Sequence, residues 1–262
     1  MMEGFSSVEL AYQEMGSGLP VILIHGFPLN RTIWYPVAEI LKDHARIILP
    51  DLRGHGASPV PEGVYSMRQM SGDILHLMDQ LKIQKAVLIG HSMGGYVGLD
   101  FAYAFPSRLA GLGLVSSHPA ADTPERKAGR LNNAEKILRK GVVKKFMEEL
   151  APRMTTKTDV VTAILPLMLK TTPQGVAGAL FGMAEREDAL DVLSNLNAPS
   201  LALVGEDDML MPGGMPETME RLMRRGWLVR IKGGGHMPML ENPEQTAAAI
   251  DQLLLAVKNM GE

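Results

Sequence analysis

The feature that most constrains the fold of this chain is the stretch from Gly90 to Gly95, which reads Gly-His-Ser-Met-Gly-Gly. It follows the apolar run 86–89, typical of a buried strand, and it precedes residues 96–103, whose apolar side chains recur at helical spacing. We therefore expect a strand that ends, turns sharply and continues as a helix. Such a turn crowds the residues two before and two after the serine, and glycine at both positions removes the side chains that would collide.

This turn would present one hydroxyl group at the edge of a sheet. Ser92 stands clear of its neighbours there, and the amide of Met93, at the positive end of the helix, faces any anion that forms. The alternative is a plain strand-to-helix loop, because short glycine and serine patterns also occur by chance. The strand before and the helix after favour a catalytic serine over that alternative.

Buried strands alternate with helices along most of the chain, which predicts an α/β fold with a doubly wound, mostly parallel sheet. Most of the strands are continuous apolar runs, as expected where both faces of a sheet are covered. The predicted strands are 7–15, 20–24, 45–49, 86–89, 109–115, 200–204 and 226–231. The predicted helices around them are 32–41, 66–81, 96–103 and 243–257.

The strand pattern is interrupted between about His118 and Arg186, where only helical segments separated by prolines and glycines occur. Four helices are predicted there, at 124–140, 142–151, 157–169 and 173–186. One crossover between parallel strands needs a single helix, so a series of crossover helices is the less favoured alternative. We expect a core formed by residues 1–117 and 191–262 and a helical cap, residues 118–190, inserted over the strand ends.

The composition excludes several classes of function. Hydrophobic residues make up 46% of the 262 residues, charged residues 21%, and the formal net charge is -3, so nothing suggests nucleic-acid binding. The chain has no cysteine, which excludes disulfides, thiolate metal sites and a cysteine nucleophile. The first 18 residues lack the basic start and apolar core of a signal peptide, and no apolar run is long enough to span a membrane. We expect a cytoplasmic protein.

Ionisable residues follow the last two predicted strands, at the edge where open parallel sheets bind ligands. A serine hydroxyl needs an imidazole to accept its proton and a carboxylate to orient that imidazole. The strand 200–204 is followed by Asp207 and Asp208, and the strand 226–231 leads to His236 in a glycine-rich loop. Spacing does not choose between the two aspartates, and the alternative for His236 is an ordinary surface histidine.

The loop after the strand 20–24 supplies a second backbone amide. Gly26 lets the chain pass close to a ligand, so the amide of Phe27 is expected to converge with that of Met93 as an oxyanion hole. The residues expected to contact substrate are His25, Gly26, His91, Met183 and Met209. Met168 and Met211 are further candidates for an adaptable apolar pocket, although such methionines more often fill the core.

These motifs together resemble those of the α/β-hydrolase superfamily over essentially the whole chain. The matching stretches are 25–28, 51–58, 90–95, 205–212 and 235–236. The resemblance implies an eight-stranded sheet with a helical cap, and it puts the acid at the fourth position of the motif that begins at Gly205, which selects Asp208. Because Ser92 stands at the nucleophile position, the related dehalogenases and epoxide hydrolases, which use aspartate, are disfavoured.

The resemblance implies a serine carboxylesterase that acts on small, fairly apolar esters through an acyl-enzyme, without a metal or organic cofactor. Residues 61–81 are similar to 3-oxoadipate enol-lactonases, which makes lactonase the alternative, although residues 118–190 contain no tryptophan. The stretch 25–28 is similar to cofactor-free perhydrolases. A hypothesis of another class is a ligand receptor or stress-signalling protein that keeps the triad but turns over little. The sequence does not choose between a monomer and a homodimer.

Overall fold

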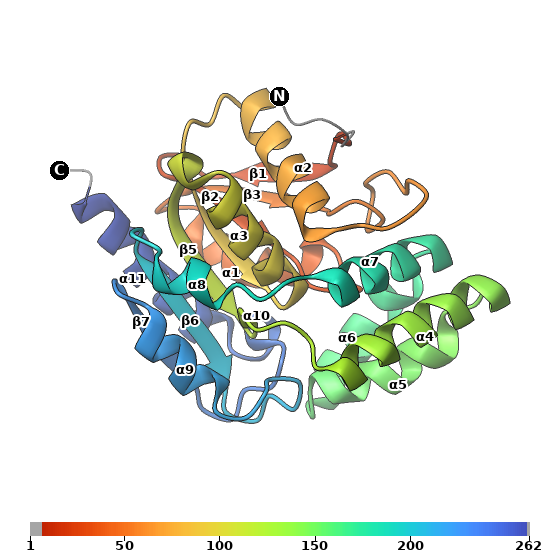
Figure 1. Ribbon diagram of the computed structural model, residues 1–262. Helices are drawn as coiled ribbons and strands as arrows, with labels where there is room; N and C mark the ends of the chain where they lie inside the picture. Colours follow the sequence, from red (N-terminus) through yellow and green to blue (C-terminus); the bar gives the residue numbers. More distant parts are fainter. Residues whose placement is uncertain (1–6, 261–262) are drawn as a thin grey trace.

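The computed structural model describes residues 7–260, and in this part of the chain seven strands form one sheet in the order β1-β3-β2-β4-β5-β6-β7. β1 is antiparallel to β3, and all the other neighbouring strands are parallel. The twisted sheet runs through the centre of the molecule (Figure 1). The strands are β1 Tyr12–Met15, β2 Pro20–Ile24, β3 Arg46–Pro50, β4 Ala86–His91, β5 Leu109–Val115, β6 Ser200–Gly205 and β7 Gly226–Ile231.

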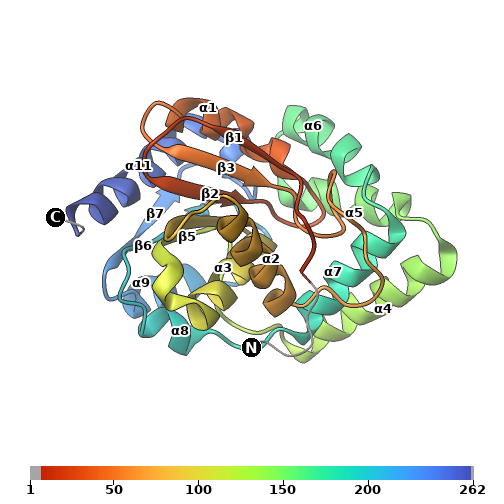
Figure 2. The same ribbon diagram turned by 90° about the horizontal axis from the view of Figure 1, so that it is seen from above.

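Helices cover both faces of this sheet, which confirms the doubly wound arrangement. Helices α1 and α11 lie on one face, and α2, α3, α8 and α9 lie on the other (Figure 2). The helices are α1 Tyr35–Leu41, α2 Met67–Gln80, α3 Met93–Ala104, α4 Pro124–Lys140, α5 Lys144–Met154, α6 Thr158–Leu169, α7 Pro173–Glu185, α8 Leu190–Ser194, α9 Met215–Leu222, α10 Pro238–Glu241 and α11 Pro243–Asn259. None of the described helices is both long and apolar enough to cross a bilayer.

The N-terminal part of the sheet differs from the prediction. The described chain forms seven strands and not eight, and β1 begins only at Tyr12. Two amides before it donate to side chains and not to a neighbouring strand: that of Val8 to Asp73 Oδ1 and that of Ala11 to Ser58 Oγ, both over 2.9 Å. Because these amides are already satisfied, an alternating sequence pattern alone does not extend the strand.

Three short helices, α8, α9 and α10, were not predicted. They contain 5, 8 and 4 residues, so none repeats its apolar positions often enough to show a helical period. Helix α5 begins two residues later than expected, because Gly141 takes a left-handed conformation with φ of 65° and ends α4. The predicted helix 32–41 divides into a 3₁₀ turn, Arg31–Trp34, and α1.

Helix α7 packs on the core through glycines at one-turn spacing. A Cβ added at Gly175 would lie 2.1 Å from the carbonyl oxygen of Gly54, and one added at Gly182 would lie 1.7 Å from that of Tyr65. Between them, the carbonyl of Gly178 accepts a hydrogen bond from the amide of Tyr65 over 3.0 Å. Backbone therefore meets backbone along this seam, and any side chain there would push α7 away from the core.

This close approach predicts opposite effects for two helical glycines. Gly182→Ala should lower the free energy of unfolding by roughly 2 kcal/mol or more, because the added methyl group overlaps a backbone carbonyl that cannot rotate away. Gly72→Ala, inside α2 with no atom within 4 Å of the added Cβ, should raise it by roughly 0.5 to 1 kcal/mol through helix propensity. Urea unfolding measures both, and equal effects of the two substitutions would contradict the packing argument.

Candidate active site

The predicted sharp turn lies between β4, which ends at His91, and α3, which begins at Met93. Ser92 between them has φ of 49° and ψ of -112°, a conformation that costs energy for any residue with a side chain. A Cβ added at Gly90 would lie 2.2 Å from the carbonyl oxygen of Gly94, and one added at Gly94 would lie 2.5 Å from that of Ile24. Glycine is therefore needed on both sides of the serine.

Neighbouring backbone holds Ser92 in this strained state. Its amide donates to the carbonyl of Val115, at the end of β5, over 2.9 Å, and its carbonyl accepts from the hydroxyl of Ser117 over 2.7 Å. Two fixed hydrogen bonds on the same residue leave the backbone little freedom to relax. The side chain is consequently held at the carboxyl end of the sheet, where the strands β4 and β5 end.

Asp208 and His236 are in direct contact although they lie on different loops. Nδ1 of His236 is 2.9 Å from both carboxylate oxygens of Asp208, and both side chains are almost completely buried. Oδ1 of the same carboxylate accepts hydrogen bonds from the amides of Leu210 and Met211. This contact orients the ring and leaves Nε2 as its other nitrogen for a reacting partner. Asp207, by contrast, is exposed to solvent.

The surroundings favour the ionised form of Asp208. Burial by itself disfavours the charged carboxylate, but the charge and hydrogen bond of His236, together with the amide of Leu210, hold the pKa of Asp208 below its ordinary value. A carboxylate that stays ionised can stabilise an imidazolium formed on His236.

The loop that carries His236 is attached to the end of α5. The amide of His236 donates to the carbonyl of Met154 over 2.8 Å, and the amide of Gly235 donates to Glu241 Oε2 over 2.5 Å. Glu241 also accepts a hydrogen bond from the hydroxyl of Thr155. Sequence reasoning missed Glu241, because a single acid between Leu240 and the proline-started helix α11 looks like any exposed helical acid.

Ser92 and His236 line the same cavity, whose volume is about 260 Å³. Helices α4, α5 and α7 contribute much of its wall. The apolar part of the lining includes Phe27, Phe146, Leu180, Met183 and Met211, and the polar part includes Tyr96, Ser116, His118, Arg126, Arg130, Asn133 and Arg153. The arginines were not singled out in the sequence, because a charged residue on a helix usually faces solvent.

Two amides are available near this cavity. Within the described residues, neither the amide of Phe27 nor that of Met93 donates to a protein acceptor. Met93 is the first residue of α3, where the amides point out of the helix along its positive end. Phe27 lines the cavity itself. These two amides are the donors that the sequence predicted for an oxyanion.

Several predicted substrate contacts lie elsewhere. His25 is fully buried, with Nδ1 donating to the carbonyl of Gly26 and Nε2 accepting from the amide of Leu52, both over 2.9 Å. His91 is also fully buried and donates through Nε2 to the carbonyl of His236. Neither ring nor Gly26 lines the cavity, and both rings hydrogen-bond to backbone of the surrounding loops, so their contact with substrate stays a prediction.

Of the methionines predicted to form an apolar pocket, some line the cavity and others do not. Met183 and Met211 line the cavity, whereas Met168 is fully buried and absent from its lining. Met209 is 58% exposed and also lies outside the lining, so its expected contact with substrate stays a prediction. The loop around it is folded on Asp208, whose carboxylate accepts from the two amides that follow Met209.

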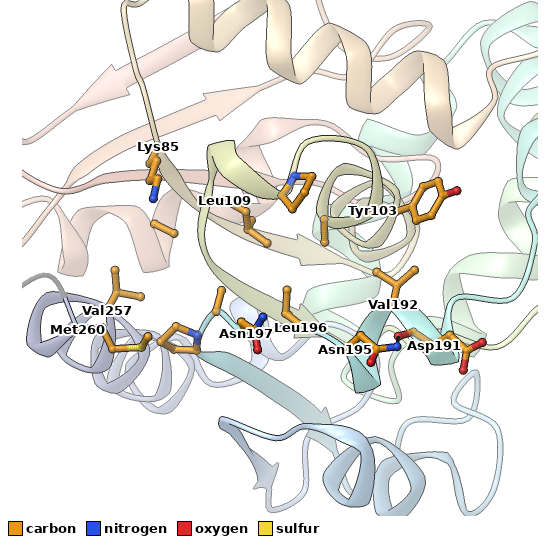
Figure 3. A pocket seen from close by; sticks show the side chains of 15 residues that line it. Lys85, Tyr103, Leu109, Asp191, Val192, Asn195, Leu196, Asn197, Val257 and Met260 are labelled. Carbon is orange, nitrogen blue, oxygen red and sulfur yellow. Dashed lines mark hydrogen bonds between the residues drawn. The ribbon is translucent and has the colours of Figure 1, made fainter.

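A larger cavity, of about 750 Å³, lies at the opposite end of the sheet (Figure 3). It is lined by the start of β5 and by parts of α3, α8 and α11, and its titratable side chains are Lys85, Tyr103 and Asp191. It contains neither a serine nor a histidine. Size alone therefore does not identify the reactive site. Across residues 7–260, no group of three or more His, Asp or Glu side chains is arranged to hold a metal ion.

Comparisons with known proteins identify the family of this chain. A model described as "Alpha/beta hydrolase family" matches residues 21–249. A thermophilic esterase from Thermogutta terrifontis, solved with malate bound, is 42% identical with a TM-score of 0.91, over 95% of this chain and 94% of that one. The enol-lactonase from Burkholderia xenovorans LB400 is 25% identical with a TM-score of 0.86, over 95% and 97%. The pimeloyl-[acyl-carrier protein] methyl ester esterase of Aeromonas salmonicida is 27% identical over 251 residues, or 91% and 96% of the two chains.

The buried histidines predict how the stability of this fold depends on pH. Burial is the main cause that lowers the pKa of His25 to about 4 and those of His55, His91 and His118 to about 3. In the unfolded chain these rings take up protons below about pH 6.5, so the unfolded state binds more protons and stability falls on acidification from there to about pH 4. Each ring contributes at most about 1.4 kcal/mol per pH unit.

Urea unfolding between pH 7 and pH 4.5 tests this. His118→Gln should reduce the slope of the free energy of unfolding against pH by about one proton, because it removes one buried ring that stays neutral in the folded chain. A free energy of unfolding that stays constant from pH 6.5 to pH 4.5 would be incompatible with four buried neutral rings.

Proposed function

Because this chain belongs to the alpha/beta hydrolase family, we propose that it hydrolyses small carboxylic esters through an acyl-enzyme formed on Ser92. The observation that carries this proposal is the buried contact between Asp208 and His236, which opens on the same cavity as the strained serine. A serine hydroxyl, an imidazole and a carboxylate on three separate loops are the parts that nucleophilic acyl transfer needs.

In the first half of the proposed reaction, Nε2 of His236 accepts the hydroxyl proton of Ser92 while Oγ attacks the ester carbonyl carbon. The electron pair of the carbonyl moves to its oxygen, and the amides of Phe27 and Met93 stabilise that oxyanion. The intermediate collapses, the alcohol leaves with the proton from His236, and the acyl group stays on Oγ. Asp208 remains ionised throughout and keeps Nδ1 in its donating form.

In the second half, His236 accepts a proton from a water molecule while the water oxygen attacks the acyl carbonyl carbon. The amides of Phe27 and Met93 again stabilise the oxyanion. The acid leaves when His236 returns the proton to Oγ of Ser92. Both halves use the same three side chains and the same two amides, so the reaction needs no cofactor.

We infer that residues 118–190 form a cap over a core made of residues 1–117 and 191–262. This inference is supported by helices α4, α5 and α7, which contribute to the wall of the cavity opposite Ser92. It is also supported by the hydrogen bond between the amide of His236 and the carbonyl of Met154, which joins the end of α5 to the catalytic loop. In this arrangement the cap determines which substrates reach the serine.

The cavity supports small substrates with an apolar part. Its volume of about 260 Å³ lies below the roughly 300–1,000 Å³ that is usual for sites of drug-sized ligands. The apolar lining, including Phe27, Phe146 and Leu180, suits a short hydrocarbon chain. Esters are the first choice because the relatives described above include two esterases. Lactones are the second, because the similarity to an enol-lactonase extends over almost the whole chain.

Replacement of the nucleophile is the direct test. Ser92→Ala should lower the turnover of p-nitrophenyl acetate by about four to six orders of magnitude, because no other group on this chain is proposed to form the acyl-enzyme. Ser107→Ala, which removes an exposed hydroxyl far from the cavity, serves as the matched control and should keep full activity. Circular dichroism checks that both variants are folded.

A fluorophosphonate probe gives a second measurement that does not depend on the choice of substrate. It should label the parent protein and Ser107→Ala at Ser92, and it should not label Ser92→Ala. A panel of short esters and lactones then ranks the two substrate classes by kcat/KM. Retained turnover in Ser92→Ala would refute the mechanism, and labelling without turnover of any ester or lactone would favour a receptor that keeps the triad.

A further inference from the structure

Three arginines line the cavity that contains Ser92, and among the described residues no aspartate or glutamate lines it. Arg126 and Arg130 are four residues apart on α4 and so lie on the same face of that helix, and Arg153 is near the end of α5. The rest of the lining is mainly apolar. A fully apolar ester bound here would shield these guanidinium groups from water without giving them an anion to pair with, which costs free energy.

The carboxylates near this wall are too few to balance its positive charge. Asp122 forms ion pairs with Arg130 at 2.5 Å, with Arg186 at 2.8 Å and with Arg126 at 3.6 Å, so one anion serves three cations. In the part of the chain that the structure describes, Arg126, Arg130 and Arg186 pair with no carboxylate other than Asp122. The excess positive charge also acts on His118, whose pKa is lowered to about 3 by burial first and then by Arg186 and Arg126.

Several guanidinium donors at the cavity lack a strong acceptor. Nη1 of Arg130 has only a sulfur near it, Sδ of Met183 at 3.2 Å, which is a weak acceptor. Nη2 of Arg126 reaches the carbonyl of Leu210 at 3.4 Å, close to the limit for a hydrogen bond. Arg153 forms no ion pair or side-chain hydrogen bond with any other described residue. A planar guanidinium with free donors matches the two oxygens of a carboxylate.

We propose that Arg126 and Arg130 form a carboxylate-binding subsite, with Arg153 at its edge, and that the ester or lactone substrate carries a carboxylate. This inference rests on the proposed function, because the reacting carbonyl is assigned to Ser92. The apolar lining then holds a short hydrocarbon chain between the carbonyl and the carboxylate. Monoesters of short dicarboxylic acids, and lactones with a carboxylate substituent, have this chemistry, and the small volume of the cavity excludes long chains.

A matched pair of substrates tests the subsite. Monomethyl glutarate carries the carboxylate, and methyl 4-carbamoylbutanoate has nearly the same shape with a neutral amide in its place. The parent protein should hydrolyse the monoester with a kcat/KM at least about 10-fold higher, and Arg126→Gln should lower that value by roughly 10- to 100-fold, as expected for lost hydrogen bonds between charged groups. The value for the neutral amide should change less than about twofold in the same variant.

The variant Lys127→Gln is the control for the loss of a positive charge as such. This substitution removes one positive charge from the same helix, at an exposed position that does not line the cavity, and it should leave both substrates unaffected. Arg153→Gln is a second variant at an exposed position, and it removes no ion pair or side-chain hydrogen bond within the described residues, so we expect it to fold. It should reduce kcat/KM for the monoester only. Equal rates for the two substrates, or equal losses in the Arg126 and Lys127 variants, would overturn the subsite and leave ester hydrolysis by Ser92 intact.

Binding without turnover separates the two proposals. Calorimetric titration of glutarate into the Ser92→Ala protein measures the subsite even where no substrate is hydrolysed. Glutarate binding that is weakened roughly 10-fold by adding Arg126→Gln, but not by adding Lys127→Gln, supports the subsite. Absence of glutarate binding overturns it, whatever the result of the fluorophosphonate labelling.

Discussion

The backbone contact around Ser92 is the constraint on which the rest of this structure depends. The serine is held at a positive φ where Gly90 lets the two ends of the turn meet and Gly94 lets the turn approach the end of β2, at distances that no side chain permits. The strain is offset by the hydrogen bonds of Ser92 to Val115 and Ser117 and by the largely buried strands β2 and β4 beside the turn. The rigid sheet therefore holds the hydroxyl of Ser92 at its carboxyl end.

The second half of the site depends on contacts between segments that are far apart in the chain. The loop of His236 is held by Asp208 through the ring, by His91 and Met154 through the backbone, and by Glu241 through the neighbouring amide of Gly235. Met154 belongs to α5, so movement of this helix would be transmitted directly to the loop. The helices around the cavity thus contribute to the position of the histidine as well as to the shape of the binding space.

Two kinds of surface meet in the small cavity. Apolar side chains from the loops and helices favour a hydrocarbon chain, whereas the guanidinium groups of Arg126 and Arg130 favour an anion. Both arginines lie on α4, whereas Ser92 lies in the turn after β4, so the proposed substrate extends from the end of the sheet to α4. The buried rings beneath, such as His25 and His91, stay neutral because burial lowers their pKa, and they fix loops instead of adding charge.

The sequence by itself determined the parallel sheet, the sharp turn at Ser92 and the order serine, acid, histidine, because the burial of strands and the steric demands of a turn act over a few neighbouring residues. Spacing left Asp207 and Asp208 open and only the resemblance favoured Asp208, whereas the tertiary structure brings the Asp208 carboxylate against His236 and leaves Asp207 exposed. Only the tertiary structure shows that Arg126 and Arg130 of α4 line the cavity. It also made β1 begin only at Tyr12, since the amides of Val8 and Ala11 donate to side chains from distant segments. Such contacts depend on how loops and helices pack in space, and no local pattern records that packing.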